Sequence, residues 1–161
     1  MIRPAVLADA PAICAIYNHY IAATTISFEE APVGADEMAQ RMQGVMAMLP
    51  WLVYEEENGT VVGYAYATKW RVRAAYRYTV ESSVYVAQDR PRRGIGSVLS
   101  RALLDELRLR DVHAVIAGIA LPNEASVALH ERLGYQKVAH FREVGRKFDR
   151  WIDVGNWELL L

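Results

Sequence analysis

The chain has 161 residues, of which 53% are hydrophobic and 23% charged, and its 18 basic and 19 acidic side chains leave a net charge of −1. This length predicts a single domain over residues 1–161, large enough to bury a core without disulfides or metals. The balanced charge gives no support for a nucleic-acid or membrane-surface partner.

The compartment is indicated by the cysteine content and by the first residues. Cys14 is the one cysteine in the sequence, which excludes an intrachain disulfide and fits a reducing compartment. Asp9 and Pro11 interrupt the apolar residues near the start, so we expect no signal peptide. No apolar run approaches the ~20 residues of a membrane-spanning helix. The sequence therefore predicts a cytoplasmic protein.

The first third of the chain predicts a short strand and two helices. A strand over Ile2–Ala5 precedes Asp9, a candidate helix N-cap. The apolar residues that follow recur at helical spacing, and Cys14 beside them is expected to be a buried structural thiol rather than a nucleophile. The residues of this face are Ile13, Ile16, Tyr17, Tyr20 and Ile21. A loop over Ala22–Val33 leads to a second helix over Gly34–Met48.

Strands dominate the middle of the chain. Asn58 and Gly59 form a strong hairpin-turn signal between two β-rich segments. These segments are Trp51–Glu56 and Val61–Trp70. A basic linker over Lys69–Arg77 then leads to a strand over Tyr78–Val86.

The remaining segments complete an alternating pattern of helices and strands. A helix is predicted from Ser97 to about Arg110, and the apolar run Ala114–Ala120 indicates a strand buried on both faces. A helix over Glu124–Leu133 ends at Gly134. The last two strands and their connection are Lys137–Glu143, Arg150–Leu161 and Val144–Asp149. This order predicts an α/β (α+β) fold with a mixed central sheet of about seven strands covered by about four helices.

A basic glycine loop follows the strand that ends at Val86. Its residues are Arg90, Pro91, Arg92, Arg93, Gly94, Ile95, Gly96 and Ser97. Glycines leave the backbone N–H groups unobstructed, and the first turn of a helix adds unpaired donors and a partial positive charge. The loop therefore predicts a phosphate or pyrophosphate site, with the Ser97 hydroxyl as a further donor. The alternative is an ordinary strand-to-helix turn carrying solvated arginines.

This loop resembles the acetyl-CoA loop of the GNAT N-acetyltransferases, whose pattern is Arg/Gln-x-x-Gly-x-Gly/Ala. Pro91 departs from the first position, where Arg90 or Arg92 can substitute. The segment Asn123–Tyr135 resembles the second signature of the family, and Asn123 is also a candidate N-cap. The resemblance implies the GNAT fold, acetyl-CoA as co-substrate and no metal. The residues that it implies in cofactor binding are Val84, Tyr85, Val86, Arg92, Arg93, Gly94, Ile95, Gly96, Ser97, Asn123 and Ser126.

Longer segments narrow the resemblance to phosphinothricin and methionine sulfoximine (sulfone) N-acetyltransferases. They are Ile26–Glu30, Tyr78–Val86, Ala117–Tyr135 and Val144–Leu159. The resemblance implies Glu81 and His130 as the catalytic pair. His130 stands where many GNAT enzymes carry a tyrosine that protonates the departing thiolate, and an imidazole titrating near neutrality can take and return a proton. Backbone N–H groups on the edge from Tyr85 to Ala87 are expected to polarise the thioester carbonyl.

Each catalytic assignment has an alternative. Tyr135 can place a phenol near the thiol instead of His130, and His130 can be a core residue with its polar atoms satisfied. Glu81 can form a salt bridge with an arginine of the basic linker. The candidate partners are Arg71, Arg73 and Arg77.

Substrate recognition is expected to need a cation. A substrate carboxylate binds arginine in a bidentate manner, which makes Arg71 and Arg73 candidates. Arg73 is preferred, because the W-x-x-R-x-A-Y spacing of the family recurs from Trp70 to Tyr76. The resemblance implies direct acetyl transfer to the α-amine of a small amino-acid analogue, with Phe28 at the substrate and a homodimer in which Phe28 lies near the partner's pocket. The alternatives are a GNAT enzyme acting on a peptide N-terminus or a polyamine, and a non-catalytic acetyl-CoA-binding module.

Overall fold

The computed structural model of the chain describes residues 1–90 and 94–161. Its helices and strands follow the predicted order. They are β1 (Ile2–Pro4), α1 (Ala10–Ala23), α2 (Ala35–Met46), β2 (Trp51–Glu55), β3 (Val61–Lys69), β4 (Thr79–Val86), α3 (Ile95–Arg108), β5 (Ala114–Leu121), α4 (Glu124–Arg132), β6 (Gln136–Lys147) and β7 (Arg150–Leu160). Among the described residues, no helix is both long and apolar enough to span a bilayer.

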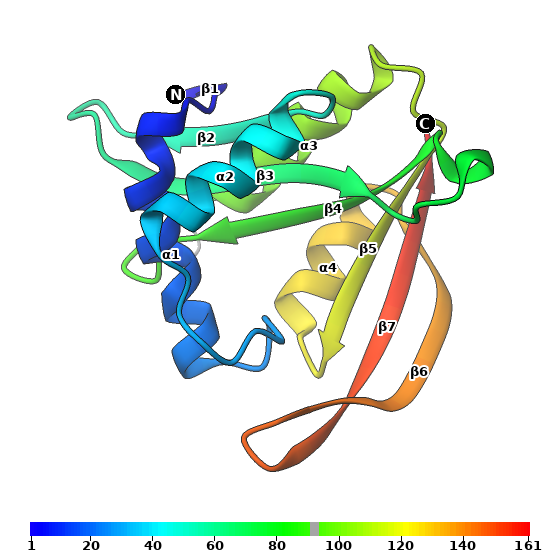
Figure 1. The fold of residues 1–161 in the computed structure, drawn as a ribbon. Coiled ribbons are helices and arrows are strands. Elements are labelled where there is room, and N and C mark those ends of the chain that lie inside the picture. Colours follow the sequence, from blue (N-terminus) through cyan, green and yellow to red (C-terminus); the bar gives the residue numbers. More distant parts are fainter. Residues whose placement is uncertain (91–93) are drawn as a thin grey trace.

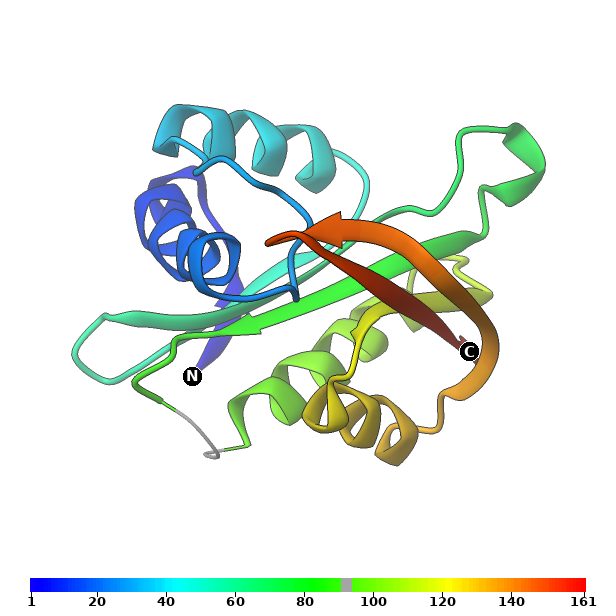
Figure 2. The same cartoon turned by 90° about the horizontal axis from the view of Figure 1, so that it is seen from below.

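The strands of the described residues form one seven-stranded sheet in the order β1-β2-β3-β4-β5-β7-β6. Neighbouring strands are antiparallel, apart from the parallel pair β4 and β5. Helices α1 and α2 cover one face of the sheet, and α3 and α4 cover the other (Figures 1 and 2). The prediction of a mixed central sheet covered by helices is therefore confirmed.

Side-chain alternation along the strands divides the core between the two faces. Tyr64 of β3 packs with α1 and α2, whereas the next residue, Ala65, packs with α3. Cys14 is buried in the layer that contains α1 and α2, with its sulfur 2.7 Å from the carbonyl oxygen of Val33. This position agrees with the prediction of a structural thiol.

The sheet opens between its two parallel strands. The β4–β5 register runs from the pair Thr79 and Ala114 to the pair Glu81 and Ile116, where the described ladder stops. Beyond that point β4 remains paired with β3 and β5 remains paired with β7, so the two strands run in different directions (Figure 1). The inner edges of β4 and β5 consequently face each other across a widening space.

The structure differs from the prediction at the last hairpin. Residues Val144–Asp149 were expected to connect two strands, but β6 continues to Lys147 and a tight turn joins it to β7. Phe148 and Asp149 form this turn with φ angles of 50° and 56°, as a primed hairpin turn requires. The turn lacks glycine, and a register shift between Phe141 and Gly145 disturbs the strand pattern, so the sequence resembled a loop.

The caps of the helices also differ in part. Asp9 precedes α1, but its side chain makes no cap hydrogen bond. Its carboxylate instead accepts hydrogen bonds from Arg3, at 2.8 and 2.9 Å, and from the Val6 N–H group. The Arg3 guanidinium holds the pKa of Asp9 below its usual range. Gly94 begins α3 with a left-handed φ of 72°, which few other residues adopt.

Candidate active site

Three hollows meet where β4 and β5 diverge. The helix cleft encloses about 740 Å³ between the end of β4, the start of α3 and one side of α4. The strand gap lies between the inner edges of β4 and β5 and reaches the N-terminal part of α4. The loop pocket encloses about 490 Å³ on the opposite face, beneath the segment between α1 and α2.

The helix cleft contains the described part of the glycine loop. Gly94, Ile95, Gly96 and Ser97 line it, and the Val98 N–H group makes the first helical bond, to Gly94. The N–H groups of the preceding turn are therefore available to an anion. The side chain of Ile95 itself is buried in the core, so only its backbone can serve the cleft.

The arginines of the loop are only partly described. The predicted contacts of Arg92 and Arg93, and the effect of Pro91, lie outside the described residues. Arg90 lines the cleft, but its guanidinium forms ion pairs with Glu56, at 3.1 Å, and with Asp89. Arg90 must leave these partners before it can replace the missing Arg/Gln of the family pattern.

The inner edge of β4 presents backbone donors to the strand gap. The Ala87 N–H group donates to Val62 of β3, and N–H groups alternate between the two edges of a strand. Val84 and Val86 therefore direct their N–H groups towards β5, whereas those of Tyr85 and Ala87 face β3. Within the predicted stretch from Tyr85 to Ala87, only Val86 therefore directs its N–H group into the gap, and Val84 is the second residue that does so.

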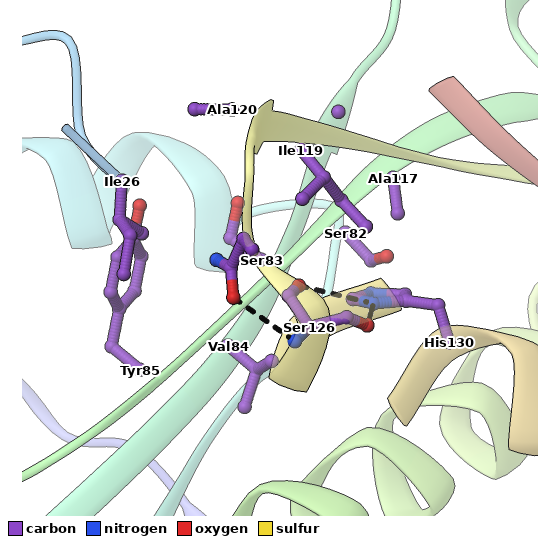
Figure 3. Close-up of a pocket in the computed structure, with 12 residues that line it drawn as sticks. Ile26, Ser82, Ser83, Val84, Tyr85, Ala117, Ile119, Ala120, Ser126 and His130 are labelled. Atoms are coloured by element: carbon purple, nitrogen blue, oxygen red, sulfur yellow. Dashed lines mark hydrogen bonds between the residues drawn. The ribbon is translucent and has the colours of Figure 1, made fainter. Parts of the chain in front are cut away.

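His130 closes the strand gap from the side of α4 (Figure 3). Asn123 caps α4 by accepting a hydrogen bond from the Ser126 N–H group at 3.1 Å, which confirms the expected cap. The Nδ1 atom of His130 lies 2.8 Å from the carbonyl oxygen of Ser126. A carbonyl only accepts, so Nδ1 is the protonated nitrogen and Nε2 carries the free lone pair.

Burial keeps His130 neutral. The residue is 6% exposed, and this burial lowers its pKa below the ordinary value of 6.5, against a smaller opposing effect of the Ser126 carbonyl. The sequence suggested an imidazole titrating near neutrality. The structure instead provides a neutral ring whose Nε2 can accept a proton at pH 7.

Tyr135 lies behind His130 rather than beside the gap. Its ring packs edge-to-face on the His130 ring with centroids 5.1 Å apart, and its hydroxyl is 3.3 Å from the Ser82 Oγ atom. Burial raises the pKa of Tyr135 to about 12. The phenol is therefore a core group that packs against the histidine, and His130 is the better placed of the two candidates.

Glu81 approaches the gap from the other face. Its side chain lines the loop pocket together with Tyr17, Ser27, Phe28 and Glu29. Burial raises the pKa of Glu81 above its ordinary value of 4.5. No ion pair within the described residues includes Glu81, so the alternative of a salt bridge to the basic linker is not observed.

Glycine at position 118 leaves room for Glu81. A Cβ atom there would lie 3.2 Å from the Glu81 Oε1 atom, and Gly118 lines both the strand gap and the loop pocket. Ile26, Ser83 and Tyr85 are likewise shared by the two hollows. The gap thus connects the face that carries His130 with the face that carries Glu81.

The hairpin of β6 and β7 packs on the segment between α1 and α2, and this segment covers the loop pocket. The buried Lys147 Nζ atom donates to the carbonyl oxygens of Ile21 and Ser27, each at 2.7 Å. At Gly145 an added Cβ would lie 2.3 Å from the Phe28 ring, so β6 packs directly on Phe28. Sequence reasoning missed Lys147, because no local pattern indicates contacts between segments so far apart.

The two arginines predicted to bind substrate lie in a separate hollow. Arg71 and Arg73 line it with Trp70 and Tyr76, and the Arg71 guanidinium lies 4.5 Å from the centre of the Trp70 ring. Their segment leaves β3 just after Thr68, the cross-strand partner of Glu81. The structure therefore brings the arginines near the strands of the loop pocket but not into its lining.

Comparisons of sequence and of structure with known proteins all give acetyltransferases. The model of the acetyltransferase (GNAT) domain family matches residues 2–155. Phosphinothricin N-acetyltransferase of Streptomyces viridochromogenes is 44% identical over 157 residues, covering 98% of this chain and 85% of the relative. The L-methionine sulfoximine/L-methionine sulfone acetyltransferase of Pseudomonas paraeruginosa is 39% identical over 164 residues, covering 99% and 94%. A GNAT superfamily phosphinothricin acetyltransferase from Sinorhizobium meliloti, solved in complex with AcCoA, aligns with a TM-score of 0.97 and 33% identity, covering 100% of this chain and 88% of that one.

Proposed function

The chain belongs to the GNAT family of acetyltransferases, and from that premise we propose that it transfers acetyl from acetyl-CoA to the α-amine of small amino-acid analogues. Phosphinothricin, methionine sulfoximine and methionine sulfone are the proposed substrates. The observation that carries the proposal is the strand gap, which lies between a helix cleft suited to an anionic cofactor and a pocket that contains the half-buried carboxylate of Glu81. Transfer is proposed to be direct, within a ternary complex.

Acetyl-CoA fits the cleft and the gap by its chemistry. The N–H groups at the start of α3 and the Ser97 hydroxyl suit its pyrophosphate. Asn123 and Ser126 lie along the gap, where the pantetheine arm would run. The N–H groups of Val84 and Val86 would donate to the thioester carbonyl oxygen and stabilise the charge that develops on it.

Glu81 is the proposed base for the incoming amine. An α-amine is mostly protonated at neutral pH and cannot attack a thioester until it loses a proton. Burial raises the pKa of Glu81, which makes its carboxylate a stronger base than an exposed glutamate. The first proton therefore passes from the ammonium group to Glu81, directly or through a water.

His130 is proposed to move the second proton. When the new C–N bond has formed and the C–S bond breaks, the nitrogen carries one surplus proton and the sulfur lacks one. Neutral His130 can accept the proton at Nε2, because its Nδ1 proton is held by Ser126. The resulting imidazolium can then return the proton to the thiolate, which leaves as the free thiol.

A homodimer is part of the proposal. Apolar side chains near the last hairpin are exposed on the single chain, although the hairpin packs against the loop that carries Phe28. They are Phe141, Val144, Phe148 and Trp151. Exposed apolar clusters of this kind mark protein–protein contacts, and a second copy seated here would lie close to the loop pocket.

The test is a thiol-release assay with purified protein and acetyl-CoA. We expect free CoA thiol with phosphinothricin, methionine sulfoximine or methionine sulfone, and much less with a polyamine or a short peptide. Thiol release with the peptide alone would favour an enzyme for peptide N-termini. If no amine releases thiol while acetyl-CoA still binds, the chain is a binding module and the proposal is wrong.

Replacing Gly96 by Val should weaken acetyl-CoA binding about tenfold or more, the cost of losing one or more hydrogen bonds to a charged group. The protein itself tolerates a Cβ at this position, since the nearest side-chain atom would be 3.7 Å away. The added methyl groups would project between α3 and the cofactor instead. Calorimetric titration with acetyl-CoA measures the effect. Unchanged affinity in a variant of unchanged melting temperature would remove the helix cleft from the proposed site.

Replacing Arg73 by Ala should raise KM for the amino acid about ten- to a hundredfold, in the range of a hydrogen bond to a charged group. The reason is loss of the predicted partner of the substrate carboxylate; Arg73 lines a separate hollow, so this pairing requires its segment to move towards the loop pocket when substrate binds. Arg77→Ala is the matched control, because the Arg77 guanidinium packs on Tyr78 and bonds the Ala74 carbonyl within the same segment. The same substrate with its carboxylate amidated should be insensitive to Arg73→Ala. Equal losses on both substrates would contradict the pairing.

A further inference from the structure

The segment between α1 and α2 forms one wall of the loop pocket, and we call it the covering segment. It comprises residues 24–34, whose backbone consists of bends and irregular structure. Ile26, Ser27, Phe28 and Glu29 line the loop pocket, and Ile26 also lines the strand gap. Because no ladder of backbone hydrogen bonds fixes such a segment, its position depends on the groups that bond to it from other elements.

Helices α1 and α2 hold the covering segment mainly from its outer side. The Arg41 guanidinium donates to both carboxylate oxygens of Glu29, at 2.7 and 3.0 Å, but the two side chains are 40% and 34% exposed. Water replaces an exposed ion pair at little cost in free energy. The Ser27 hydroxyl adds a hydrogen bond to the Tyr17 hydroxyl at 2.9 Å. The ion pair with Arg41 therefore contributes little to the position of the segment.

Lys147 holds the covering segment from the inner side. Its Nζ atom donates to the carbonyl oxygens of Ile21 and Ser27, each at 2.7 Å, and the residue is 2% exposed. Ile21 lies in the last turn of α1, where carbonyl groups lack a helical partner, so Lys147 links the end of the helix to the middle of the segment. The Phe148 ring lies 5.1 Å from the same Nζ atom. Water does not reach these bonds, and a buried carbonyl that loses its partner costs free energy.

The hairpin of β6 and β7 contacts the covering segment at a second point. A Cβ atom at Gly145 would lie 2.3 Å from the Phe28 ring, so the ring rests directly on the backbone of β6 (Figure 2). Gly145 and Lys147 are two residues apart and thus on the same face of β6. Ser27 and Phe28 are consecutive in the covering segment. The hairpin consequently fixes two neighbouring residues that line the loop pocket.

We propose that Lys147 is a positioning residue for the amine substrate. It keeps Ser27 and Phe28 against the hairpin and thereby holds the wall of the loop pocket in the conformation that binds the amine. The identity of the substrate rests on the proposed acetyl transfer, whereas the position of the covering segment can be measured without any substrate. Acetyl-CoA binding should not depend on Lys147, because the lining of the helix cleft comes from α1, α3, α4 and the end of β4.

Lys147→Met is the first test, since methionine has a similar length and no donor. We expect KM for the amino acid to rise about ten- to a hundredfold, the range of one hydrogen bond to a charged group, because only a fraction of the molecules then holds the binding conformation. The value of kcat should stay within about twofold, as Glu81 and His130 remain in place. Affinity for acetyl-CoA, measured by calorimetric titration, should not change. Lys137→Met, at an exposed position of the same strand, is the matched control and should behave like wild type.

Lys147→Gln keeps a polar group in the buried site and should fold even where Lys147→Met does not. Its side chain is one atom shorter, so its amide can donate to one of the two carbonyls but not to both. We expect KM to lie between the values of wild type and Lys147→Met. A graded series of this kind indicates that the hydrogen bonds, rather than the volume of the side chain, set KM.

The position of the covering segment is measured by ¹⁹F NMR of protein that contains fluorophenylalanine. The chain has three phenylalanines, and Phe28→Leu identifies the Phe28 signal by its loss. We expect Lys147→Met to move this signal towards its position in the unfolded chain, since the ring is no longer held against Gly145. Lys137→Met should leave the signal where wild type has it. Neither acetyl-CoA nor an amine is present in this experiment.

Three results would overturn the proposal. An unchanged Phe28 signal in Lys147→Met would show that the covering segment keeps its position without the lysine. A displaced signal with an unchanged KM would show that this position does not affect amine binding. An equal loss of amine and acetyl-CoA affinity would indicate a general disturbance of the fold. If wild type releases no thiol with any amine, the proposed function is wrong, and the Phe28 signal still decides whether Lys147 positions the segment.

Discussion

Glu81→Gln should lower kcat/KM for the amino-acid substrate about 10²–10⁴-fold at neutral pH, the usual contribution of a positioned general base. The amide occupies the same space but cannot take a proton from the ammonium group. Steady-state thiol release measures the loss. Affinity for acetyl-CoA should stay within about twofold of wild type, because Glu81 lines the loop pocket and not the helix cleft.

The role of Glu81 as a base can also be recognised from how kcat/KM and stability depend on pH. The base acts as the carboxylate, so kcat/KM should fall as pH drops through the raised pKa, which lies above 4.5. The same raised pKa affects the stability of the fold in the opposite direction to activity. Folding favours the neutral form of Glu81, so the group contributes stability below its unfolded-state pKa. This contribution is lost as pH rises through the folded-state pKa. At neutral pH the Gln variant should therefore melt at the same or a higher temperature than wild type.

A lower kcat/KM together with an unchanged or higher melting temperature would distinguish a catalytic role of Glu81 from a structural one. Glu57→Gln, at an exposed position in the β2–β3 turn, is the matched control and should change neither activity nor melting temperature. A Glu81→Gln variant that keeps nearly full kcat/KM would show that the amine is deprotonated elsewhere. A variant that loses activity only in proportion to a lower melting temperature would point to a structural role.

Part of this site could be predicted from the sequence because its motifs are contiguous. The Asn123 cap and the described part of the glycine loop, from Gly94 to Ser97, depend on local backbone chemistry, and the structure contains both. The residues that flank Glu81 and His130 are what mark these two as catalytic candidates. Their arrangement on opposite faces could not be predicted, because it depends on where the β4–β5 register ends and not on any spacing along the chain.

Long-range contacts account for most of the remainder. The Lys147 ammonium donates a hydrogen bond to the carbonyl of Ser27, 120 residues away in the sequence. Periodic patterns of apolar residues predict only local structure and cannot indicate such a contact. Of the predicted stretch from Tyr85 to Ala87, only Val86 directs its N–H group into the strand gap, because that direction follows from the pairing of β4 with β3. The position of Arg73 in a separate hollow could not be predicted either, because the basic linker has no periodic pattern of apolar residues from which its conformation could be inferred.

The tautomer of His130 sets what this residue can do for the departing thiol. A histidine that must act first as an acid would need a proton on Nε2, whereas the Ser126 carbonyl fixes the proton on Nδ1. Burial lowers the pKa of His130 below 6.5, so the ring is neutral and ready to accept at pH 7. The loss of kcat/KM at low pH should therefore contain a second component below 6.5, where imidazolium formation removes the Nε2 lone pair.

His130→Phe should cut kcat about 10²–10⁴-fold at neutral pH, because no other group then relays the proton to the thiolate. The ring of similar shape should preserve the edge-to-face contact with Tyr135, so acetyl-CoA affinity and melting temperature should change little. The pH component below 6.5 should disappear, while the component of Glu81 remains. His130→Tyr should restore part of kcat, since a phenol can also protonate a thiolate. If His130→Phe keeps nearly full kcat across the pH range, His130 is a packing residue, and the Tyr135→Phe and Glu81→Gln variants would then have to carry the whole loss.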